Sequence, residues 1–343
     1  MKKSLSIGPK SPVLVIAEIG VNHDGSLAKA LKLVRAAKKA GADAVKLQLF
    51  RADRLMHPSC DFAKYQKQRS SQKSAIEMLR QYELTDDQVR KIAAEVKSAG
   101  LWLLATPFSL GDLPLLESLN TPAIKIASPD LVNKPLLHAA SKLGLPLLIS
   151  TGAAEMLEIV LTHAWLASWK APFALFHCIS SYPTRLEDAH LSWIGELRDL
   201  FGVPVGFSDH TSETICGALA VAAGARLIEK HLTLDCRAPG PDHAASLDVP
   251  AFTEYVRLIR LAEASLGTPG KRVLPAERDV RRVSRQSLVI ARPVAKGTVL
   301  GEADFTVQRP GTGVLAARID EFVGKTATRA LTPGQMFNPN MIA

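Results

Sequence analysis

Several apolar segments of the 343-residue chain end in charged or imidazole side chains, where catalytic groups could collect. His210 and His231 close two successive segments of this kind. If these segments are neighbouring strands, both rings could bind one ion. Imidazole nitrogens with open positions for oxygen ligands suit Mn²⁺ acting as a Lewis acid. A lone histidine is more often a hydrogen-bonded core residue, so the residues alone leave both interpretations open.

Two lysines lie inside apolar segments, Lys46 in "AVKLQ" and Lys125 in "KIAS". A lysine in a buried strand is costly unless it is paired or binds an anion. The pair therefore predicts a phosphate or carboxylate between them. Asp209 and Glu229 could orient a histidine or pair with a lysine, and we favour that structural role for Glu229.

The elements that must position these residues alternate along the chain. Apolar segments of strand length span 13–19, 43–49, 101–106, 123–128, 146–151, 173–178, 203–208 and 225–231. Helix-like segments such as 26–41, 85–100 and 212–225 begin at Ser or Thr and have a Gly at or near their end. Near-continuous apolar strands indicate parallel β-structure buried on both faces.

Eight such units over roughly 250 residues predict an α/β fold, a (β/α)₈ TIM barrel, with the site at the carboxyl ends of the strands. No GxGxxG follows the first strand, which weakens the case for a dinucleotide-binding sheet. The polar residues at the strand ends are Glu18, Asn22, His23, Lys46, Gln48, Thr106, Lys125, Ser128, Ser150, Thr151, His177 to Tyr182, Ser208 to His210, and Glu229 to His231.

The chain changes character near its C-terminal end. We assign residues 1–268 to the barrel and the charged, aperiodic stretch 269–286 to a linker. Residues 287–343 contain short strands, repeated Gly turns and little helix, which predicts a small β-rich domain at the edge of what folds unaided.

Composition narrows the class of protein. An apolar fraction of 47% and a charged fraction of 22% are typical of a soluble globular protein. Of the net charge of +9, residues 271–343 hold twelve Lys or Arg against six Asp or Glu. These basic residues are scattered without interleaved aromatics, so we expect a solvated surface or attraction of small anions rather than a nucleic-acid groove.

Location follows from the N-terminal residues and the cysteines. The apolar run 13–17 is too short for a signal peptide or a membrane span. The four cysteines show no CxxC spacing, which favours reduced thiols in a cytoplasmic protein.

Ordered motifs resemble those of sialic acid synthases over nearly the whole chain. They are "AEIGVNHDG", "AVKLQ", "ATPF", "KIAS", "STG", "HCISSYP", "GFSDHT", "EKHLTLD" and "GPDHAASL". The tail "SLVIARPVAKGTVLGEADFTVQRPGTG" resembles the antifreeze-like (SAF) domain that closes those enzymes. "YQKQ" and "EMLRQYELT" look more like the N-acetylneuraminate branch than the pseudaminate branch.

The resemblance implies a transferase that condenses phosphoenolpyruvate with an open-chain N-acetylated mannosamine-type sugar, giving N-acetylneuraminate or a close relative and phosphate. It implies metal ligands at His210 and His231, with Mn²⁺ first and Mg²⁺ or Co²⁺ as alternatives. Phosphoenolpyruvate would be held by Lys46, Thr106, Lys125, Ser128, Ser150 and Ser208. The sugar would contact Glu18, Ser180, Tyr182, Asp242 and, through its N-acyl group, Arg309 in "QRPGTG".

Two departures from the family pattern leave the sugar open. Asp130 in "KIASPD" stands where the family commonly has a glutamate proposed to break down the tetrahedral intermediate. Ser180 replaces an asparagine that contacts substrate in the family. A legionaminate- or pseudaminate-type synthase, another phosphoenolpyruvate-dependent 3-deoxy-keto-acid enzyme, and a non-catalytic sugar- or ice-binding protein are the alternatives.

The resemblance also implies a homodimer in which the tail domain of one chain caps the barrel of the other. An extended linker of about nineteen residues could span on the order of 60 Å, enough to reach a neighbouring subunit. We expect neither a nucleic acid nor a membrane among the partners.

Overall fold

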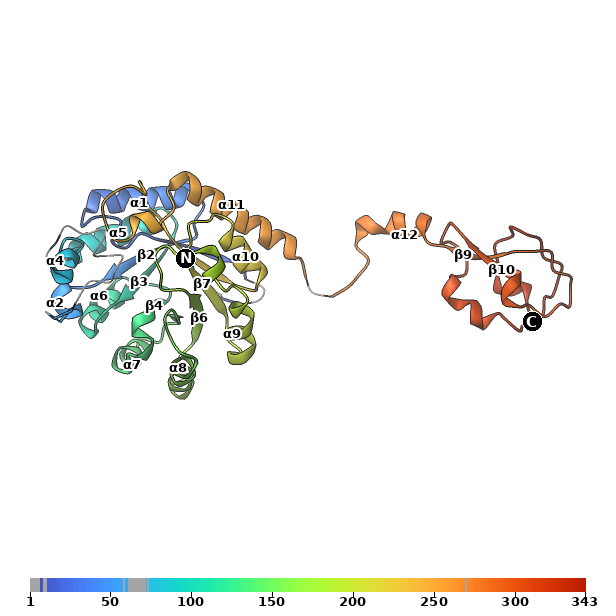
Figure 1. Cartoon of the computed structure of the whole chain (residues 1–343), viewed down its shortest axis with the longest axis horizontal. Helices are drawn as coiled ribbons and strands as arrows, with labels where there is room; N and C mark the ends of the chain where they lie inside the picture. The colour runs from blue at the N-terminus through green and yellow to red at the C-terminus, as the bar shows by residue number, and fades with distance from the viewer. Residues whose placement is uncertain (1–6, 9–10, 58, 61–71, 73, 269) are drawn as a thin grey trace. The chain divides into compact units, whose positions relative to one another are not determined.

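The computed structural model describes residues 7–8, 11–57, 59–60, 72, 74–268 and 270–343 (Figure 1). The chain divides into two compact units, Met1–Gly267 and Thr268–Ala343. None of the described helices combines the length and apolarity needed to cross a membrane.

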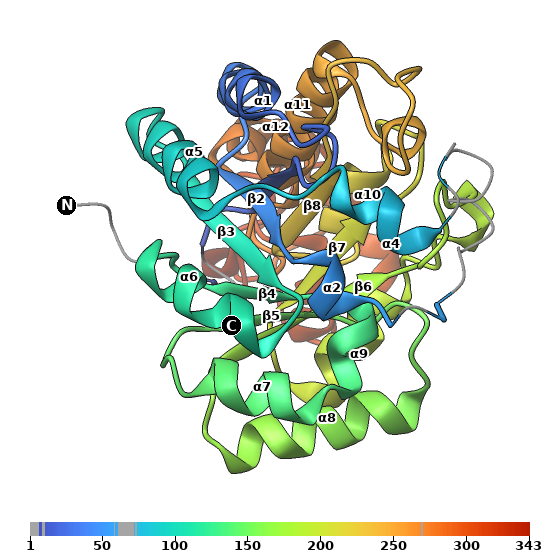
Figure 2. The same cartoon turned by 90° about the vertical axis from the view of Figure 1, so that its left-hand side faces the viewer.

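Eight parallel strands of the first unit close into a barrel, which confirms the predicted fold (Figure 2). Each strand pairs with its neighbours in chain order, and β1 pairs with β8. The strands are β1 (Leu14–Glu18), β2 (Ala44–Leu49), β3 (Trp102–Pro107), β4 (Ile124–Ile126), β5 (Leu147–Ser150), β6 (Phe173–Cys178), β7 (Val205–Asp209) and β8 (Leu227–His231).

Helices surround the strands, and local sequence sets where several of them begin. The Ser26 side chain caps α1, and Thr85 with Gln88 forms a capping box on α5. The helices are α1 (Leu27–Lys39), α2 (Ala52–Leu55), α4 (Ala75–Arg80), α5 (Asp86–Ser98), α6 (Leu113–Ser118), α7 (Lys134–Ser141), α8 (Met156–Ser168), α9 (Trp193–Phe201), α10 (Cys216–Ala222) and α11 (Val249–Leu266). Short 3₁₀ turns include η1 (Leu110–Asp112), η2 (Ser128–Val132), η3 (Leu186–Asp188) and η4 (His243–Ala245).

The helix predicted to begin at Ser212 instead begins at Cys216. The backbone ahead of it is held in side-chain turns, because Asp209 Oδ1 accepts from Thr211 N at 2.8 Å and Thr211 Oγ1 accepts from Glu213 N at 3.4 Å. These turns compete with the helical hydrogen bonds that residues 212–215 would otherwise make.

The barrel interior is apolar at one end and polar at the other. Ile16, Leu104, Leu148, Phe176 and Leu227 form a buried cluster within it. Two residues further along each strand, the same face carries a polar residue or a cysteine, because side chains on one face repeat with a period of two. The apolar cluster therefore closes the amino end, and the polar residues collect at the carboxyl end.

The second unit is small and β-rich, as predicted, with β9 (Ser287–Ile290) and β10 (Phe305–Gln308) paired antiparallel. Leu288, Ile290, Phe305 and Phe337 are among its buried core. The remaining short elements are η5 (Pro275–Glu277), η6 (Glu302–Asp304), η7 (Ala316–Glu321) and η8 (Pro339–Met341).

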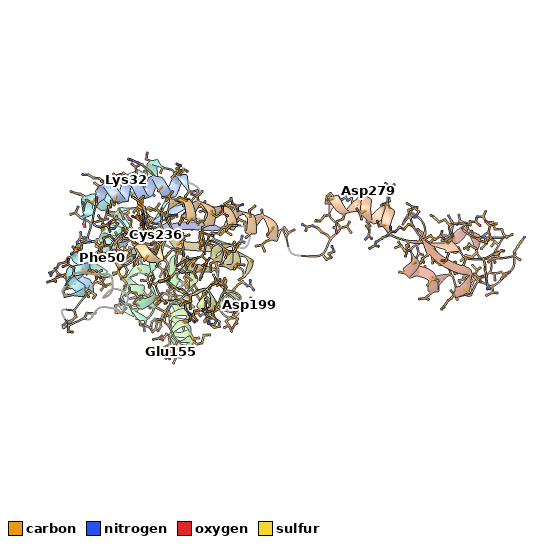
Figure 3. The ribbon with its side chains drawn as sticks, turned by 45° about the horizontal axis from the view of Figure 1, so that its top comes forward. Lys32, Phe50, Glu155, Asp199, Cys236 and Asp279 are labelled. Carbon is orange, nitrogen blue, oxygen red and sulfur yellow. The ribbon has the colours of Figure 1, made fainter. Side chains whose placement is uncertain are left out.

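The stretch interpreted as a linker contains a helix that the sequence did not predict, α12 (Arg278–Ser284). Asp279, which Figure 3 labels, pairs with Arg282 at 2.9 Å one turn along this helix. The Arg282 carbonyl accepts from Gly311 N at 2.9 Å, so α12 contacts the loop after β10. The charged sequence carries no apolar stripe, and for that reason its periodicity gave no helical signal.

Candidate active site

A group of buried polar residues occupies the carboxyl end of the barrel interior, where the sequence predicted the site. Their side chains are mostly withdrawn from solvent yet contact one another across strands that are distant in sequence. In strand order the group contains Glu18, Lys46, Gln48, Thr106, Lys125, Ser150, Ser208, His210, Glu229 and His231.

Lys46 is paired with two carboxylates. Its Nζ lies 2.8 Å from Glu18 Oε2 and 2.9 Å from Glu229 Oε1. Burial opposes ionisation of Glu229, but Lys46 and Lys125 outweigh it and lower the pKa of this carboxyl to about 2. The structure therefore confirms the pairing role favoured for Glu229 and places a carboxylate of the protein itself beside the two lysines.

Lys125 has no carboxylate at ion-pair distance among the described residues. Its Nζ donates to Ser150 Oγ and, at 3.1 Å, to the Ile126 carbonyl, and it lies 5.1 Å from the centre of the Phe176 ring. Burial lowers the pKa of Lys125 to about 8, although Glu229 opposes that shift. The ammonium is thus cationic at neutral pH and lightly compensated.

Hydroxyl groups line the interior next to this cation. Ser150 Oγ lies 3.3 Å from Ser208 Oγ. Thr106 Oγ1 is buried and has no hydrogen-bond partner within the described residues. A buried hydroxyl without a partner is costly, so this corner is suited to a ligand that accepts hydrogen bonds. A cation and three hydroxyls match the chemistry of a bound phosphate or carboxylate.

His210 and His231 lie together, with ring centres 5.6 Å apart. The Nδ1–H of His210 donates to the Ile179 carbonyl at 2.8 Å, which leaves the lone pair of Nε2 available to bind an ion when the ring is neutral. Burial, reinforced by His210 and Lys46, lowers the pKa of His231 well below its ordinary value, so His231 is a neutral imidazole. Its Nδ1 is buried and has no hydrogen-bond partner within the described residues.

This arrangement fits a divalent ion with incomplete protein ligation. Within the residues that the structure describes, no cluster of three or more His, Cys, Asp or Glu side chains is placed to hold a metal. The two imidazoles could supply two nitrogen ligands, while the unpartnered nitrogen of His231 and the backbone-oriented ring of His210 suit that task. The remaining positions would be open to water or substrate oxygens.

Two residues predicted to bind the sugar lie beside the histidines. The Tyr182 ring centre is 4.1 Å from that of His210 and 6.3 Å from that of His231. Asp242 Oδ2 lies 3.7 Å from His231 Nδ1. Glu18 lies on the adjoining strand β1, where it is the register partner of His231. Its carboxylate accepts from Gly20 N and pairs with Lys46.

Ser128 and Ser180 meet at Gly152. Ser128 Oγ accepts from Gly152 N at 3.0 Å, and a Cβ at Gly152 would come closer than 3.0 Å to both serine hydroxyls. Asp130 is turned to a different partner, since its Oδ1 accepts from Asn133 Nδ2 at 2.9 Å. Burial raises the pKa of Asp130 above its ordinary value, and the Asn133 bond partly opposes this.

Two further predicted features are not among the described residues of the first unit. Arg309 is exposed in the second unit, directly after β10. The "YQKQ" motif, residues 65–68, lies outside the described residues.

Sequence reasoning included Cys178 only in the strand-end range His177 to Tyr182 and gave it no role in the interior. Its Sγ lies 3.7 Å from His210 Nδ1, and it pairs in register with Ser208. The signal was its place two residues after inward-facing Phe176. His177, by contrast, faces outward, where Nε2–H donates to the Ala189 carbonyl at 2.7 Å.

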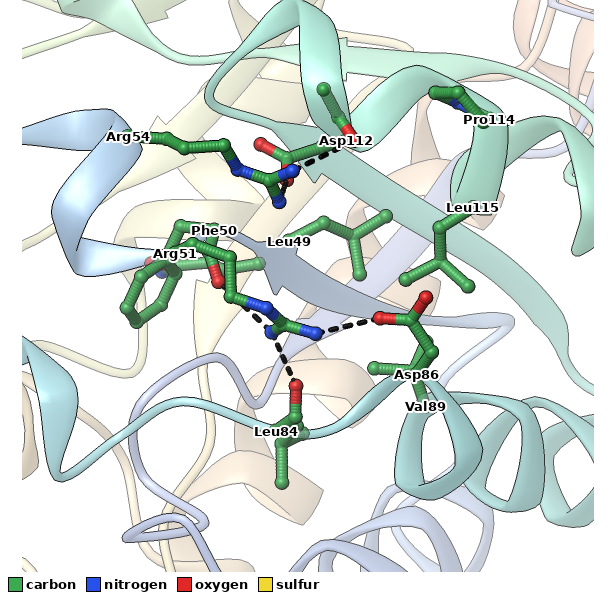
Figure 4. A pocket seen from close by; sticks show the side chains of 12 residues that line it. Leu49, Phe50, Arg51, Arg54, Leu84, Asp86, Val89, Asp112, Pro114 and Leu115 are labelled. Carbon is green, nitrogen blue, oxygen red and sulfur yellow. Dashed lines mark hydrogen bonds and ion pairs between the residues drawn. The ribbon is translucent and has the colours of Figure 1, made fainter.

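A cavity of about 270 Å³ is lined by the end of β2, including Gln48 of the interior group, and by residues of α2, α5 and α6 (Figure 4). Its arginines are already engaged. Arg51 donates to the Leu84 carbonyl and pairs with Asp86 at 2.6 Å, while Arg54 pairs with Asp112 at 2.5 Å. We infer that these contacts are structural and attach the segment after β2 to α5 and η1.

Comparison with known proteins gives consistent matches. A family model described as the NeuB family matches residues 33–271, and one described as the SAF domain matches residues 285–343. The N,N'-diacetyllegionaminic acid synthase of Legionella pneumophila is 38% identical over 334 residues, which cover 95% of this chain and 94% of that protein. The N-acetylneuraminate-9-phosphate synthase of Homo sapiens is 33% identical over 303 residues, covering 88% and 84%. A crystal structure of N-acetylneuraminic acid (sialic acid) synthetase from Leptospira borgpetersenii has a TM-score of 0.73 at 31% identity, covering 82% of this chain and 94% of that one.

Proposed function

The chain belongs to the NeuB family, as its motifs predicted, and from that premise we propose that it is a nonulosonic acid synthase. It would condense phosphoenolpyruvate with an open-chain N-acetylated mannosamine-type sugar and release phosphate. The observation that carries this proposal is the lightly compensated Lys125 with its hydroxyls, close to two imidazoles at one end of the barrel.

The anionic substrate would bind through Lys125, Thr106, Ser150 and Ser208. The ammonium and the unpartnered Thr106 hydroxyl offer charge and hydrogen bonds that the protein leaves unused. Lys46 has a different task in this arrangement, since it holds Glu18 and Glu229 in place and would reach the ligand only while paired with them.

A divalent ion held by His210 and His231, Mn²⁺ first and Mg²⁺ or Co²⁺ as alternatives, would polarise the sugar aldehyde. Tyr182 and Asp242 adjoin the imidazoles and would orient the sugar there. Carbon 3 of phosphoenolpyruvate would then bond to the aldehyde carbon, water would add at carbon 2, and phosphate would leave by C–O cleavage.

The other predicted residues would act around this centre. Ser128 would help hold phosphoenolpyruvate. Glu18 and Ser180 would contact the sugar, and Arg309 its N-acyl group. Asp130, whose Oδ1 is held by Asn133, would assist breakdown of the tetrahedral intermediate through a bridging water. We retain the cytoplasmic location predicted from the sequence, which the free thiol state of all four cysteines supports.

The experiment that tests the function is a phosphate-release assay with phosphoenolpyruvate and a panel of amino sugars. N-acetylmannosamine and its 2,4-diacetamido-2,4,6-trideoxy relative are the decisive members. Phosphate release that depends on one of these sugars is the expected result. Release with neither sugar, from folded protein supplied with Mn²⁺, would contradict the proposal.

The 2,4-diacetamido sugar is a second candidate substrate, and one observation favours it. The Legionella relative, at 38% identity, is named for N,N'-diacetyllegionaminic acid, whereas the human relative named for N-acetylneuraminate 9-phosphate is 33% identical. A larger kcat/KM with the diacetamido sugar than with N-acetylmannosamine would decide for it.

We further propose that the enzyme is a homodimer whose tail units cap barrels in exchange. The test is to co-express an Arg309→Ala chain, with a damaged cap, and a His210→Ala chain, with a damaged barrel. In an exchanged dimer, random pairing makes half the dimers mixed, and each mixed dimer has one intact site, so roughly a quarter of wild-type activity returns. If mixed dimers are present by mass and no activity returns, each chain caps itself.

A further inference from the structure

A charged cluster is buried on the outer side of β7 and β8, directly behind the two histidines. Asp209 and Lys230 precede His210 and His231 in sequence and are register partners in the sheet. Both side chains are fully buried, and the Lys230 Nζ lies 3.4 Å from Asp209 Oδ1. Because successive residues of a strand point to opposite faces, this pair faces away from the site that the histidines enter.

The cluster holds both backbone polar groups of Thr211, the residue after His210. Asp209 Oδ1 accepts from Thr211 N at 2.8 Å, and Lys230 Nζ donates to the Thr211 carbonyl. The His210 carbonyl itself accepts from Thr184 N at 2.8 Å. The residues on either side of His210 are therefore held by one ion pair that also includes the residue before His231.

Tyr255 of α11 completes the cluster. Its hydroxyl donates to Asp209 Oδ2 at 2.8 Å, and its ring centre lies 5.9 Å from Lys230 Nζ. Gly217, inside α10, makes room for it, since a Cβ there would come closer than 3.0 Å to the Tyr255 ring and hydroxyl. Glycine inside a helix is less stable than alanine, so α10 loses helix stability in favour of this tyrosine.

Stability alone is a weak reason for such a cluster. Buried ion pairs can often be replaced by apolar residues of similar size without loss of stability. The contacts here converge on the backbone N–H and C=O of Thr211. Thr211 directly follows His210, the residue whose ring enters the site. Groups that hydrogen-bond a metal ligand set its orientation in other proteins, and this cluster would do so through the backbone beside the ligand.

We propose that Asp209, Lys230 and Tyr255 are positioning residues that hold His210 and His231 at the separation and angle needed to share one divalent ion. This inference rests on the proposed metal role of the two histidines. Tyr255 acts through Asp209, and neither it nor Lys230 touches substrate.

The test measures Mn²⁺ binding by the full-length protein with electron paramagnetic resonance, without substrate. Tyr255→Phe removes the hydroxyl from Asp209 and keeps the ring, while Gly217→Ala displaces the tyrosine from the other side. Thr162→Val in α8 is the matched control, because it removes a buried hydroxyl that donates to the Leu131 carbonyl of η2 at 2.8 Å. We expect Tyr255→Phe and Gly217→Ala to weaken Mn²⁺ binding about tenfold, the lower end of the range for outer partners of metal ligands.

The control should lose thermal stability as Tyr255→Phe does, yet bind Mn²⁺ like the wild type. Variants that keep wild-type Mn²⁺ affinity and lose only stability would overturn this inference and leave the proposed function untouched. A wild-type protein that binds no Mn²⁺ would overturn the metal role in the proposed function as well. Measuring the wild type first therefore distinguishes the two failures. If Tyr255→Phe does not fold, the Mn²⁺ affinity of Gly217→Ala tests the same inference.

Discussion

The two sides of β7 and β8 carry polar and charged residues that are similarly buried but differ in how fully their hydrogen bonds are satisfied. On the outer side, Asp209 accepts hydrogen bonds at both carboxylate oxygens and Lys230 lies against it. On the inner side, His231 Nδ1 and Glu229 Oε2 are buried without a hydrogen-bond partner among the described residues, as is Thr106 Oγ1 on β3. Burial is therefore similar on both sides, whereas unused hydrogen-bonding capacity is confined here to the inner side.

This contrast distinguishes the outer cluster, which supports the barrel, from the inner group, which could bind a ligand. Native proteins leave few buried polar atoms unpaired, because each costs about 1–3 kcal/mol. Several such atoms at one end of the barrel indicate groups that await a ligand. The outer cluster, with its contacts complete, can be structural or positioning but offers nothing to a substrate. Variants on the two sides should accordingly fail in different ways.

The largest effect is expected on the inner side, from a His210→Ala, His231→Ala double variant. Loss of both imidazoles should abolish phosphate release, because the ion would have no protein ligand left. Chelation of the wild type should do the same, with Mn²⁺ restoring activity. Full activity of the double variant in chelator would leave the histidines as core residues.

His177 gives the matched control for that experiment. It lies on the neighbouring strand β6, but it faces outward and binds the Ala189 carbonyl. His177→Ala should lower the melting temperature, because a buried carbonyl loses its partner. The fraction that remains folded should release phosphate at the wild-type rate and respond to chelator normally.

The next effect separates the two interior lysines, which the sequence could not distinguish. Lys46→Met leaves Glu18 and Glu229 without their cation, and breaking a buried pair in this way typically costs about 3–5 kcal/mol of unfolding free energy. Lys125→Met breaks no direct ion pair, and buried Glu229 keeps Lys46 as a partner while it loses the more distant cation. We therefore expect a smaller loss of stability than for Lys46→Met. The KM of Lys125→Met for phosphoenolpyruvate should rise roughly 10- to 100-fold, the value of a hydrogen bond to a charged group.

Urea denaturation and steady-state kinetics on the two variants measure both quantities. Equal destabilisation by the two substitutions would show that Lys125 is as much a structural cation as Lys46. An unchanged KM in Lys125→Met would remove Lys125 from the anion site altogether.

The sequence predicted much of the barrel and its polar end because both follow from local periodicity. An apolar strand followed by polar residues at its carboxyl end places Lys125, Ser150 and His231 in the interior without knowledge of any distant contact. The same alternation would have shown Cys178 facing inward and His177 outward.

What the sequence could not predict depends on contacts across the fold. Lys46 meets Glu229 from 183 residues away, and Tyr255 meets Asp209 from 46 residues away. The bond between Asp130 and Asn133 is different, because these residues are close in sequence and the 3₁₀ turn η2 brings them together. No spacing in the chain fixes which carboxylate reaches which cation, since that choice is made when the strands close into a barrel.

The smallest effect is a pH dependence that belongs to Lys125. Burial lowers the pKa of this lysine from 10.5 to about 8, and a bound anion would raise it again. Phosphoenolpyruvate affinity should therefore hold steady up to about pH 8 and then fall by as much as tenfold per pH unit, since the neutral amine must be protonated on binding.

The stability of the ligand-free protein should change with pH in the opposite direction. Between pH 8 and 10.5 the unfolded chain binds the more protons, so this lysine's contribution to the free energy of unfolding rises with pH. Equilibrium binding and urea denaturation from pH 7 to 10 measure the two trends, and Lys125→Met should flatten both. If affinity and stability both fall above pH 8, in the wild type and in Lys125→Met alike, another group is responsible for the titration. Lys125 would then be a paired structural cation, as Lys230 is.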